Sequence, residues 1–421
     1  MHYDDLIVGA GLYGCVYAYE MYRRGRKCLV IDSRPHVAGN AYTSETRGIQ
    51  VHEYGAHIFH TTDQEVWEYV HKFAQFNHYV NAPVAVFKDE LYNLPFNMNT
   101  FNRLWGVKTP KEAEEKIRAQ SEEAIRELLC MRLKARPESI TKEQIASFEA
   151  ENLEEQGLSL AGRDLFNRLV RGYTEKQWGR PCKELPAFIL KRLPFRFTYD
   201  NNYFNDPFQG IPIGGYTRMC ERMLRLLPNG RDANSLETDG VLEVKLDTPY
   251  EEFVKLSEAG LPAQDKADRT KPYRTVNGDT FSNLIFTGRI DTFFDYRFGT
   301  LEYRSLRFEK EDMPEVDNYQ GNAVVNYTAA DVPYTRIIEH KHFEFGRGQG
   351  TVITREYPDA YEKGKEPYYP VNDEKNNALY ARYLSYAKDF PRITFGGRLG
   401  SYQYYNMDQV IRAALDAAAR V

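Results

Sequence analysis

Apolar runs and helix-like segments alternate at the start of the chain. Residues 6–8 (Leu-Ile-Val) predict a strand, residues 16–24 predict a helix that Gly25 ends, and residues 28–31 (Cys-Leu-Val-Ile) predict a second strand. Continuous apolar runs of this length are typical of parallel strands that are buried on both faces. The start of the chain therefore predicts an α/β unit in which helices cover a parallel sheet.

The end of the chain repeats this pattern. A short apolar run at residues 393–395 leads into a glycine turn, and a helix is predicted from about Asp408, which we expect to be its N-cap. Two segments in between, at 242–246 and 283–287, also have the character of buried strands. We therefore expect well-separated segments of the chain to build one discontinuous domain.

The middle of the chain predicts helices and then further strands. Thr109 opens a capping box with proline at the first helical position, which predicts a charged helix to about residue 135. Another helix is expected at roughly residues 160–170. Residues 171–181 then break the helical pattern and predict a polar loop. Aromatic strands recur between residues 293 and 342, as in an antiparallel sheet.

A glycine motif lies between the first two predicted strands. Gly9, Gly11 and Gly14 fit G-x-G-x-x-G, in which the glycines allow a tight turn, close approach of a pyrophosphate and close packing of helix on sheet. Asp32 ends the second strand, where a ribose hydroxyl would donate to its carboxylate. Because strand, helix, strand and acid occur in this order, the motif predicts dinucleotide binding rather than a glycine turn without function.

The residues after Asp32 favour FAD over a nicotinamide dinucleotide. Ser33 and a basic residue, Arg34, precede a second turn of small residues that ends at Asn40. An additional turn facing phosphate is more typical of FAD proteins than of nicotinamide dehydrogenases. The N-terminus of the C-terminal helix would face the flavin and stabilise negative charge on its reduced form.

These patterns predict the α/β class. They indicate a Rossmann-like FAD-binding part built from separated segments of the chain, a helical insertion, and an antiparallel sheet layered over the first part.

Composition narrows the classes of partner. A chain of 421 residues is long enough for two or three domains, and a net charge of −5 gives no reason to expect nucleic acid or an anionic membrane surface. No apolar run approaches a membrane span and no signal peptide precedes the first strand. The five scattered cysteines lack metal-ligand spacing. They predict reduced thiols in a cytoplasmic protein without a metal site.

Seven further motifs occur in one order and make the chain resemble bacterial UDP-galactopyranose mutases over nearly its whole length. They lie at residues 55–61, 93–98, 172–178, 212–217, 332–336, 366–370 and 396–404. The resemblance implies an FAD enzyme that interconverts UDP-α-D-galactopyranose and UDP-α-D-galactofuranose, which supplies galactofuranose for cell-surface glycans. It also implies an isomerase that forms a homodimer or a higher homo-oligomer.

The resemblance further implies three domains: a discontinuous Rossmann-like FAD-binding domain, a helical insertion domain, and a twisted antiparallel sheet domain that carries substrate contacts. The expected boundaries are 1–80 with 210–250, 280–297 and 388–421 for the FAD domain, 100–180 for the helical domain, and 81–99 with 181–209 and 298–387 for the sheet domain.

The family's chemistry places particular demands on the protein. Only reduced FAD is active, with NAD(P)H as the expected reductant. Its N5 attacks the anomeric carbon, expels UDP and forms a covalent sugar adduct. The protein must therefore hold and neutralise a departing diphosphate, which is a task for preorganised cations and hydroxyls.

The resemblance also implies roles for individual residues. Arg192 and Arg336 would bind the diphosphate, with Arg192 on a loop at residues 186–196 that closes over substrate, and His57 would lie beside the flavin and act largely through its backbone. The remaining substrate contacts would be Tyr203, Tyr369 and Tyr404 on the diphosphate, Tyr173 on uracil, Trp178 beside the sugar, and Asn406 near Tyr404. The cofactor contacts would be Gly9, Gly11, Gly14, Asp32, Ser33, Asn40, His57, Arg398 and Met407.

Several positions depart from the family pattern. Ala38 stands where glycine is usual, and Asn406 stands where aspartate is frequent, which removes one negative charge beside the diphosphate. Leu169 and Val170 occupy positions that are commonly aromatic next to the uridine. Residues 258–280 are expected to be an insertion.

Two other classes of function share the same flavin domain. The first is a flavin oxidoreductase of the amine-oxidase or desaturase kind, and the second is an FAD-binding module without catalysis. An apolar or amine substrate has no use for two arginines and three phenols, which argues against the oxidoreductase. The charged and phenolic clusters therefore favour the mutase.

Overall fold

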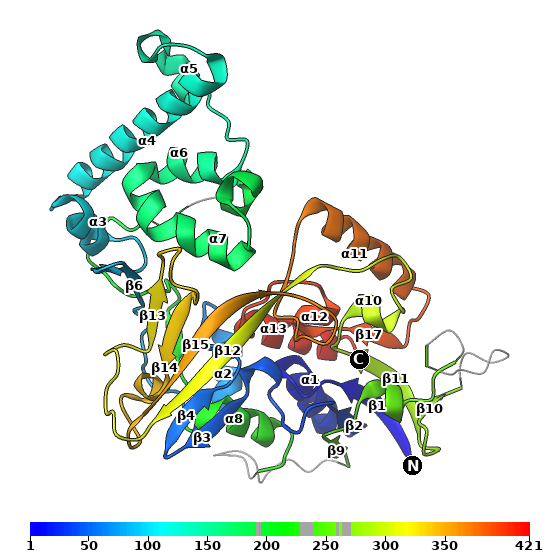
Figure 1. Cartoon of the computed structure of the whole chain (residues 1–421). Coiled ribbons are helices and arrows are strands. Elements are labelled where there is room, and N and C mark those ends of the chain that lie inside the picture. The colour runs from blue at the N-terminus through cyan, green and yellow to red at the C-terminus, as the bar shows by residue number, and fades with distance from the viewer. Residues whose placement is uncertain (191–192, 194, 228–238, 258–260, 263–270) are drawn as a thin grey trace.

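Two sheets and one group of helices make up the molecule (Figure 1). The computed structural model describes the chain except for residues 191–192, 194, 228–238, 258–260 and 263–270. The expected substrate contact Arg192 and much of the expected insertion lie outside the described residues. Among the described helices, none is both long and apolar enough to cross a membrane.

The first sheet is parallel apart from one short edge strand. Its order is β10-β11-β1-β2-β9, with β17 also paired to β11. The apolar runs at residues 6–8 and 28–31 lie in its two central strands, as predicted. The strands are β1 (His2–Val8), β2 (Lys27–Ile31), β9 (Val241–Lys245), β10 (Tyr273–Arg274), β11 (Thr280–Phe286) and β17 (Ile393–Phe395).

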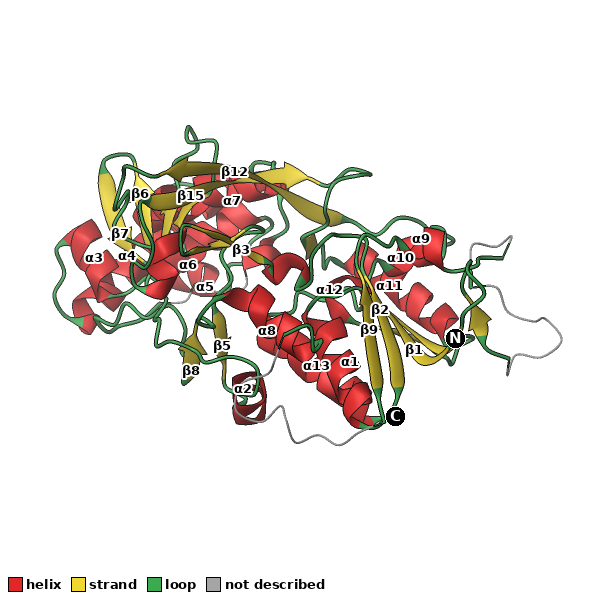
Figure 2. Ribbon diagram, turned by 90° about the horizontal axis from the view of Figure 1, so that it is seen from below, coloured by secondary structure: helices red, strands yellow, loops and turns green. Residues whose placement is uncertain are grey.

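Successive residues of this sheet enter two different cores. Ile7 and Val30 pack against α1, α8 and α13, whereas Leu6 and Leu29 pack against the layer that holds α10 and α11. Figure 2 shows α1, α8 and α13 together on one side of the strands. The helices are α1 (Leu12–Arg23), α2 (Gln64–His71), α8 (Gly215–Met223), α9 (Tyr250–Phe253), α10 (Ile290–Phe293), α11 (Glu374–Ala387), α12 (Gly397–Gly400) and α13 (Met407–Ala419).

The second sheet has seven strands in the order β16-β12-β15-β14-β13-β6-β7. All its pairs are antiparallel except β13 with β6. Its strands are β6 (Val84–Phe87), β7 (Glu90–Asn93), β12 (Tyr303–Met313), β13 (Val324–Tyr327), β14 (Arg336–Glu339), β15 (Thr351–Ala360) and β16 (Tyr369–Pro370). Two small antiparallel pairs complete the strands, β3 (Thr43–Thr46) with β4 (Ile49–His52) and β5 (Phe59–Thr61) with β8 (Phe208–Gly210).

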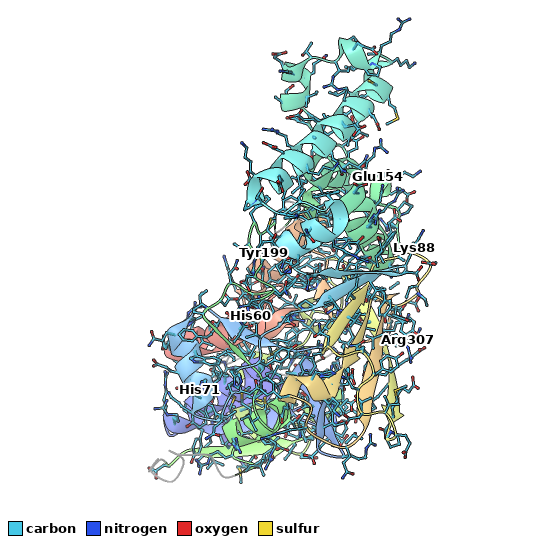
Figure 3. The ribbon with its side chains drawn as sticks, turned by 90° about the vertical axis from the view of Figure 1, so that its left-hand side faces the viewer. His60, His71, Lys88, Glu154, Tyr199 and Arg307 are labelled. Carbon is cyan, nitrogen blue, oxygen red and sulfur yellow. The ribbon has the colours of Figure 1, made fainter. Side chains whose placement is uncertain are left out.

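A group of helices projects from the end of the second sheet (Figure 1). It encloses a core of its own around Phe101, Leu165 and Phe166. Tyr199, labelled in Figure 3, joins the segment before β8 to this group, because its hydroxyl donates to the Lys108 carbonyl at 2.9 Å. The helices are α3 (Met98–Trp105), α4 (Pro110–Leu133), α5 (Lys142–Ala146), α6 (Leu153–Leu165) and α7 (Gly172–Trp178).

The prediction of a polar loop at residues 171–181 is wrong. A π-helical turn, η3 (Phe166–Arg171), continues directly into α7, so Tyr173 and Trp178 are helical residues. The helix ends at Gly179, which has a φ of +66°. Gly172 and Gly179 flank this helix and lowered its apparent propensity, but docking onto the second sheet stabilises it.

The N-cap predicted for the last helix is also wrong. Asn406 precedes α13, and its backbone N–H donates to Gln409 Oε1 at 2.9 Å. Asp408 instead lies in the first turn, where it accepts a hydrogen bond from the Thr61 hydroxyl at 3.0 Å. The α/β class and the Rossmann-like unit predicted from the sequence are confirmed.

Candidate active site

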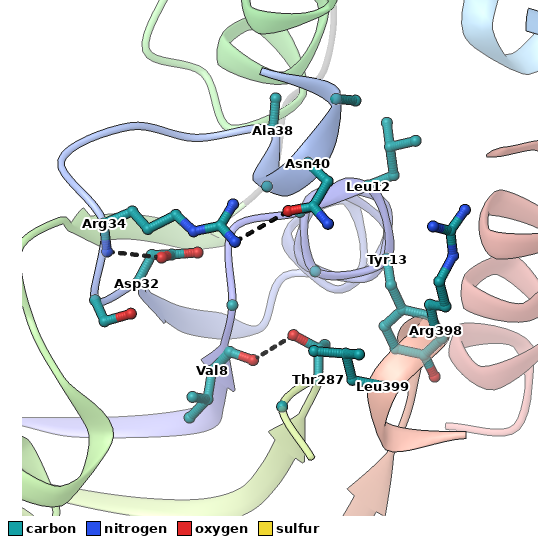
Figure 4. Close-up of a pocket in the computed structure, with 18 of the residues that line it drawn as sticks. Val8, Leu12, Tyr13, Asp32, Arg34, Ala38, Asn40, Thr287, Arg398 and Leu399 are labelled. Atoms are coloured by element: carbon teal, nitrogen blue, oxygen red, sulfur yellow. Dashed lines mark hydrogen bonds between the residues drawn. The ribbon is translucent and has the colours of Figure 1, made fainter. Parts of the chain in front are cut away.

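A cleft of about 360 Å³ lies where β1, β2 and β11 end at their carboxyl sides (Figure 4). Clefts at this edge of a parallel sheet are the usual place for a dinucleotide. All nine residues expected to contact the cofactor line it: Gly9, Gly11, Gly14, Asp32, Ser33, Asn40, His57, Arg398 and Met407. The cleft therefore brings together segments from both ends of the chain.

The three motif glycines serve different purposes in this cleft. A Cβ on Gly9 would lie 1.9 Å from Oγ1 of Thr287, and a Cβ on Gly14 would lie 1.9 Å from the Gly9 carbonyl oxygen. By contrast, a Cβ on Gly11 would meet only the Cα of Gly39, at 3.8 Å, among the described residues. The protein's own packing thus requires the first and third glycines. The absence of a side chain at Gly11 leaves room for a ligand instead.

The Asp32 carboxylate connects the glycine turn to the loop after β2. It accepts the Ala10 N–H at 2.7 Å and the Arg34 N–H at 2.9 Å, one on each oxygen. A ribose hydroxyl would therefore share this carboxylate with two backbone donors. Each carboxylate oxygen accepts more than one hydrogen bond, so this arrangement fits a dinucleotide.

Arg34 is a residue of this cleft that the sequence did not assign to the site. One nitrogen, Nη2, donates to Asn40 at 3.0 Å and pairs with Glu366 at 2.5 Å (Figure 4). The other, Nη1, is buried and has no hydrogen-bond partner among the described residues. An unsatisfied buried donor costs about 1–3 kcal/mol, so a phosphate or ribose oxygen is its natural partner. Its signal in the sequence was a basic residue two positions after Asp32.

The N-terminus of α13 faces the same cleft, because Met407 and Val410 line it. The free N–H groups of a helix N-terminus favour negative charge. Arg398 adds a full positive charge on the neighbouring wall. The residues present therefore fit an FAD whose reduced ring carries negative charge.

A chain of buried histidines fixes the turn that carries His57. The His57 N–H donates to Nδ1 of His52 at 3.2 Å, and the His52 N–H donates to Nδ1 of His340 at 3.1 Å. The hydroxyl of Tyr216 donates to the His57 carbonyl at 3.1 Å. Both backbone groups of His57 are therefore held, in keeping with the backbone role that the sequence predicts for this residue.

Burial keeps these imidazoles neutral. It lowers the pKa of His340 to about 3 and the pKa of His57 to about 4; for His57 the Gly55 carbonyl opposes this change and Arg398 adds to it. Burial likewise holds the pKa of His52 well below its usual range, assisted by His340. A neutral imidazole can accept a backbone N–H on Nδ1, as His52 and His340 do here, whereas a protonated imidazole cannot.

Arg336, at the start of β14, is the centre of a second group of residues. Its Nη2 donates to the Tyr173 hydroxyl at 2.9 Å, and its Nε lies 3.1 Å from a carboxylate oxygen of Glu356, which is 4% exposed. Burial opposes the charge on this guanidinium, but Glu356 and the phenols of Tyr173 and Tyr369 raise its pKa above the ordinary value. A permanent cation is thus held in a partly buried place, with 27% of its side chain exposed.

Phenols surround this cation and connect it to the cofactor cleft. Tyr369 and Tyr404 stack with their ring centroids 5.0 Å apart, and the guanidinium of Arg398 lies 5.7 Å and 5.6 Å from the two rings. Burial raises the pKa of both phenols, so they remain hydrogen-bond donors at neutral pH. Since Arg398 also lines the cofactor cleft, the two groups share a wall.

The remaining expected substrate contacts lie around this group. Burial and the Tyr173 phenol raise the pKa of Tyr203, and Arg336 opposes this rise. Trp178 is half-buried against the helical core, and Asn406 caps α13. Arg192 lies outside the described residues. The sequence did not indicate Glu356 as a residue of the site. Its signal was an acidic residue at every-second-residue spacing from Val352 and Thr354, on the same buried face of β15.

Comparisons with known proteins agree with this arrangement. The family model for UDP-galactopyranose mutase matches residues 168–404, and a model for NAD(P)-binding Rossmann-like domains matches residues 7–73. The chain is 36% identical over 417 residues to the dTDP-fucopyranose mutase of Escherichia coli, which covers 98% of this chain and 97% of that protein. It is also 36% identical over 417 residues to a probable UDP-galactopyranose mutase of Klebsiella pneumoniae, covering 98% and 93%.

Solved structures share the fold at low sequence identity. Reduced UDP-galactopyranose mutase superposes with a TM-score of 0.66 at 14% identity, covering 100% of this chain and 94% of that one. A putrescine oxidase superposes with a TM-score of 0.51 at 14% identity, covering 100% and 99%. At such identities the likeness concerns the fold alone, and the fold is common to different chemistries.

The motif glycines give a matched pair of substitutions. Gly14→Ala should lower the free energy of unfolding by about 3 kcal/mol, because its methyl group overlaps the Gly9 carbonyl. Gly11→Ala should change the free energy of unfolding by less than about 1 kcal/mol but weaken FAD binding at least tenfold. Thermal unfolding and the flavin content of purified protein measure the two effects. Normal FAD binding by Gly11→Ala would contradict the ligand role of that glycine.

The buried histidines predict acid sensitivity. In the unfolded chain His340 binds a proton below a pKa of about 6.5, whereas in the folded chain its pKa is about 3. Between these two values only the unfolded chain is protonated at His340. The protein should therefore become less stable as the pH falls below about 6.5. Protonation of His340 in the unfolded chain alone should lower the free energy of unfolding by about 2 kcal/mol between pH 7 and pH 5. Denaturant unfolding of His340→Asn should show a smaller loss over this interval. His71, an exposed histidine of α2, is the matched site for the control His71→Asn.

Proposed function

Because the chain belongs to the UDP-galactopyranose mutase family, we propose that it interconverts UDP-α-D-galactopyranose and UDP-α-D-galactofuranose. The proposal makes it an isomerase that uses FAD in its reduced form, with NAD(P)H as the reductant. It further holds that the protein is cytoplasmic, that it forms a homodimer or a higher homo-oligomer, and that its product supplies cell-surface glycan synthesis.

One observation carries this proposal: the partly buried guanidinium of Arg336 in a group of phenols that shares a wall with the cofactor cleft. The cation donates to the Tyr173 hydroxyl, its charge is favoured by the Tyr369 phenol, and it opposes the rise in the pKa of Tyr404. Fixed cations and hydroxyl donors are what a diphosphate requires, and Arg398 connects them to the wall of the cleft. A nucleotide sugar held here would present its sugar towards the cleft.

When bound, reduced FAD supplies an electron-rich nucleophile for the anomeric carbon of the sugar. The chain's residues act on the other side of that bond. Arg336 neutralises the diphosphate as its bond to the sugar breaks, and Tyr369 and Tyr404 donate to its oxygens. Because these groups are already in place, they retain the diphosphate for the return step without reorganisation.

The uridine end is assigned to α7 and to the segment that follows it. Tyr173 would stack on the base, Trp178 would lie beside the sugar, and Tyr203 would donate to the diphosphate. Arg192, on the 186–196 loop, would supply a second cation as that loop closes. On the cofactor side the His57 turn would lie against the flavin through its backbone, which the hydrogen bonds from Tyr216 and to His52 hold in place.

The equal identity to a dTDP-fucopyranose mutase favours a second candidate, in which the same reaction is carried out on a dTDP-linked 6-deoxy sugar. Both candidates need the same diphosphate contacts and differ at the base, the ribose and the sugar C6. Leu169 and Val170, in the turn before α7, are 5% and 6% exposed, so they pack into the core of the helical group rather than form an open surface.

A flavin oxidoreductase is the candidate of a different class. The putrescine oxidase likeness shows only that the fold accommodates such chemistry. The charged and phenolic group around Arg336 has no role with an amine or apolar substrate. UDP binding, followed by quenching of the fluorescence of Trp178, separates the two classes, because only a nucleotide-sugar enzyme should respond.

The decisive experiment follows products by chromatography. Dithionite-reduced protein is incubated separately with UDP-galactofuranose and with dTDP-fucofuranose. Conversion of the first substrate with a higher kcat/KM supports the proposal, and preference for the second supports the other candidate. Full FAD occupancy without turnover of either substrate would refute both nucleotide-sugar candidates and leave the oxidoreductase and the non-catalytic module.

Arg336→Ala should lower kcat by at least about a hundredfold while leaving FAD bound, because the cation stabilises charge that develops as the diphosphate departs. Arg307→Ala is the matched control. It removes an arginine from β12 of the same sheet, where the side chain is 52% exposed and labelled in Figure 3. Steady-state kinetics with reduced enzyme measure both variants. Activity of Arg336→Ala within a few-fold of the wild type would exclude this role.

A further inference from the structure

The helix α7 lies unusually close to the backbone that connects β13 to β14. A Cβ on Gly172, the first residue of the helix, would lie 2.4 Å from the Thr328 carbonyl oxygen and 3.0 Å from the Ala330 nitrogen. One turn earlier, the Thr328 hydroxyl donates to the Arg168 carbonyl at 2.6 Å. The N-terminal end of α7 is thus seated directly on the main chain of this connection, residues 328–335.

Lys176 ties the middle of the same helix to the same connection. Its ammonium donates to three backbone carbonyls, those of Tyr327 at 2.7 Å and of Val332 and Tyr334 at 3.0 Å each. An ammonium has three N–H donors, and all three are used. Burial lowers the pKa of Lys176 to about 8 and Asp331 opposes this, so the group is charged at pH 7.

The three carbonyls lie on the chain that leads directly into Arg336. Tyr173, one turn before Lys176 on α7, accepts the hydrogen bond from Arg336 Nη2 at 2.9 Å. A residue and its neighbour three positions on share one side of a helix, so the two contacts belong to the same docked face. The position of the Tyr173 hydroxyl on Arg336 therefore depends on how α7 sits on residues 327–335.

We propose that Lys176 is a positioning residue: its ammonium sets α7 against the β13–β14 connection so that Tyr173 meets both Arg336 and the bound nucleotide. The inference rests on the proposed function for the identity of the ligand, a uridine or thymidine diphosphate. Lys176 itself touches neither the sugar nor the cofactor in this assignment. It acts by fixing the distance between the group that binds the base and the group that binds the diphosphate.

Arg336 does not need this help. It begins β14, which is paired with β13 on one side and β15 on the other, and Glu356 lies opposite it in that register. Loss of the Lys176 ammonium should therefore displace Tyr173 more than Arg336. The expected signature is weaker binding of the nucleotide with little change in the chemical step.

A second contact holds the far end of α7 and provides the competing explanation. Arg304 of β12 donates to the Gln177 carbonyl at 2.7 Å, close to the C-terminus of the helix. If Arg304 and the close seating at Gly172 suffice to dock the helix, removal of the Lys176 ammonium will not alter nucleotide binding. The experiment below distinguishes these cases.

The test compares Lys176→Met with Lys183→Met at pH 7. Methionine keeps the apolar stem and removes the ammonium, and Lys183 is an exposed lysine of the same region, so the pair matches the change in charge. For Lys176→Met we expect about a tenfold rise in the Kd of UDP and in KM, with kcat within about twofold of the wild type. Lys183→Met should behave as the wild type. Unchanged UDP binding by Lys176→Met would overturn the inference.

A double-mutant cycle tests whether Lys176 acts through Tyr173. In a Tyr173→Ala background, Lys176→Met should raise the Kd of UDP by less than about threefold, because the ring that it positions is gone. A full tenfold effect there would contradict the positioning role.

Hydrogen exchange of the 172–178 amides, measured without nucleotide, gives a readout that is independent of the proposed function. Exchange should be faster in Lys176→Met and unchanged in Lys183→Met. Wild-type protein that binds neither UDP nor dTDP would refute the proposed function, whereas unchanged exchange would refute the docking by Lys176.

Discussion

The structure depends on keeping one partly buried guanidinium, that of Arg336, charged and paired. Burying an unpaired cation costs several kcal/mol, and a single opposing carboxylate rarely offsets that cost unless further hydrogen bonds complete the site. Glu356 and the Tyr173 phenol supply these contacts to Arg336 from two different parts of the chain. The sheet, the helical group and the loops between them must therefore meet at this point.

The second requirement is that this cation lies next to the cofactor cleft. The first sheet ends in the glycine turn and in Asp32, and the α12–α13 region closes the cleft from the other end of the chain. Arg398 belongs to that closing segment and lies over the Tyr369 and Tyr404 rings. The same few residues thus line the cofactor cleft and contact the phenols of the group around Arg336.

The sequence predicted the parts of the fold that follow from local patterns. Unbroken apolar runs identified the central strands, and the glycine motif with Asp32 identified the cleft, because these signals are short in range. The sequence did not predict the helix α7, because Gly172 and Gly179 lower helix propensity there and docking on the second sheet supplies the stabilisation. It also failed at Asp408, since Asp and Asn are equally good caps and only the path of the chain decides between them.

Site residues divide in the same way. Arg336 and the phenols followed from a resemblance carried by motifs, whereas Arg34, Glu356 and Lys176 are defined by partners that are distant in sequence. Glu356 of β15 lies opposite Arg336 of β14, although the two residues are 20 positions apart in the sequence. No local pattern around either residue announces that pairing. The histidine chain from His57 to His340 is likewise visible only in three dimensions.

The discontinuous first sheet has a consequence for how the protein is made. Its central strand β1 lies beside β11, and α13, the last helix of the chain, packs against α1, the first. Arg24 even donates to the Ala418 carbonyl at 2.6 Å. On the ribosome, the N-terminal βαβ segment must therefore wait, with one apolar helix face uncovered, until α13 has been translated. A nascent chain of this topology has reason to be shielded by chaperones during synthesis.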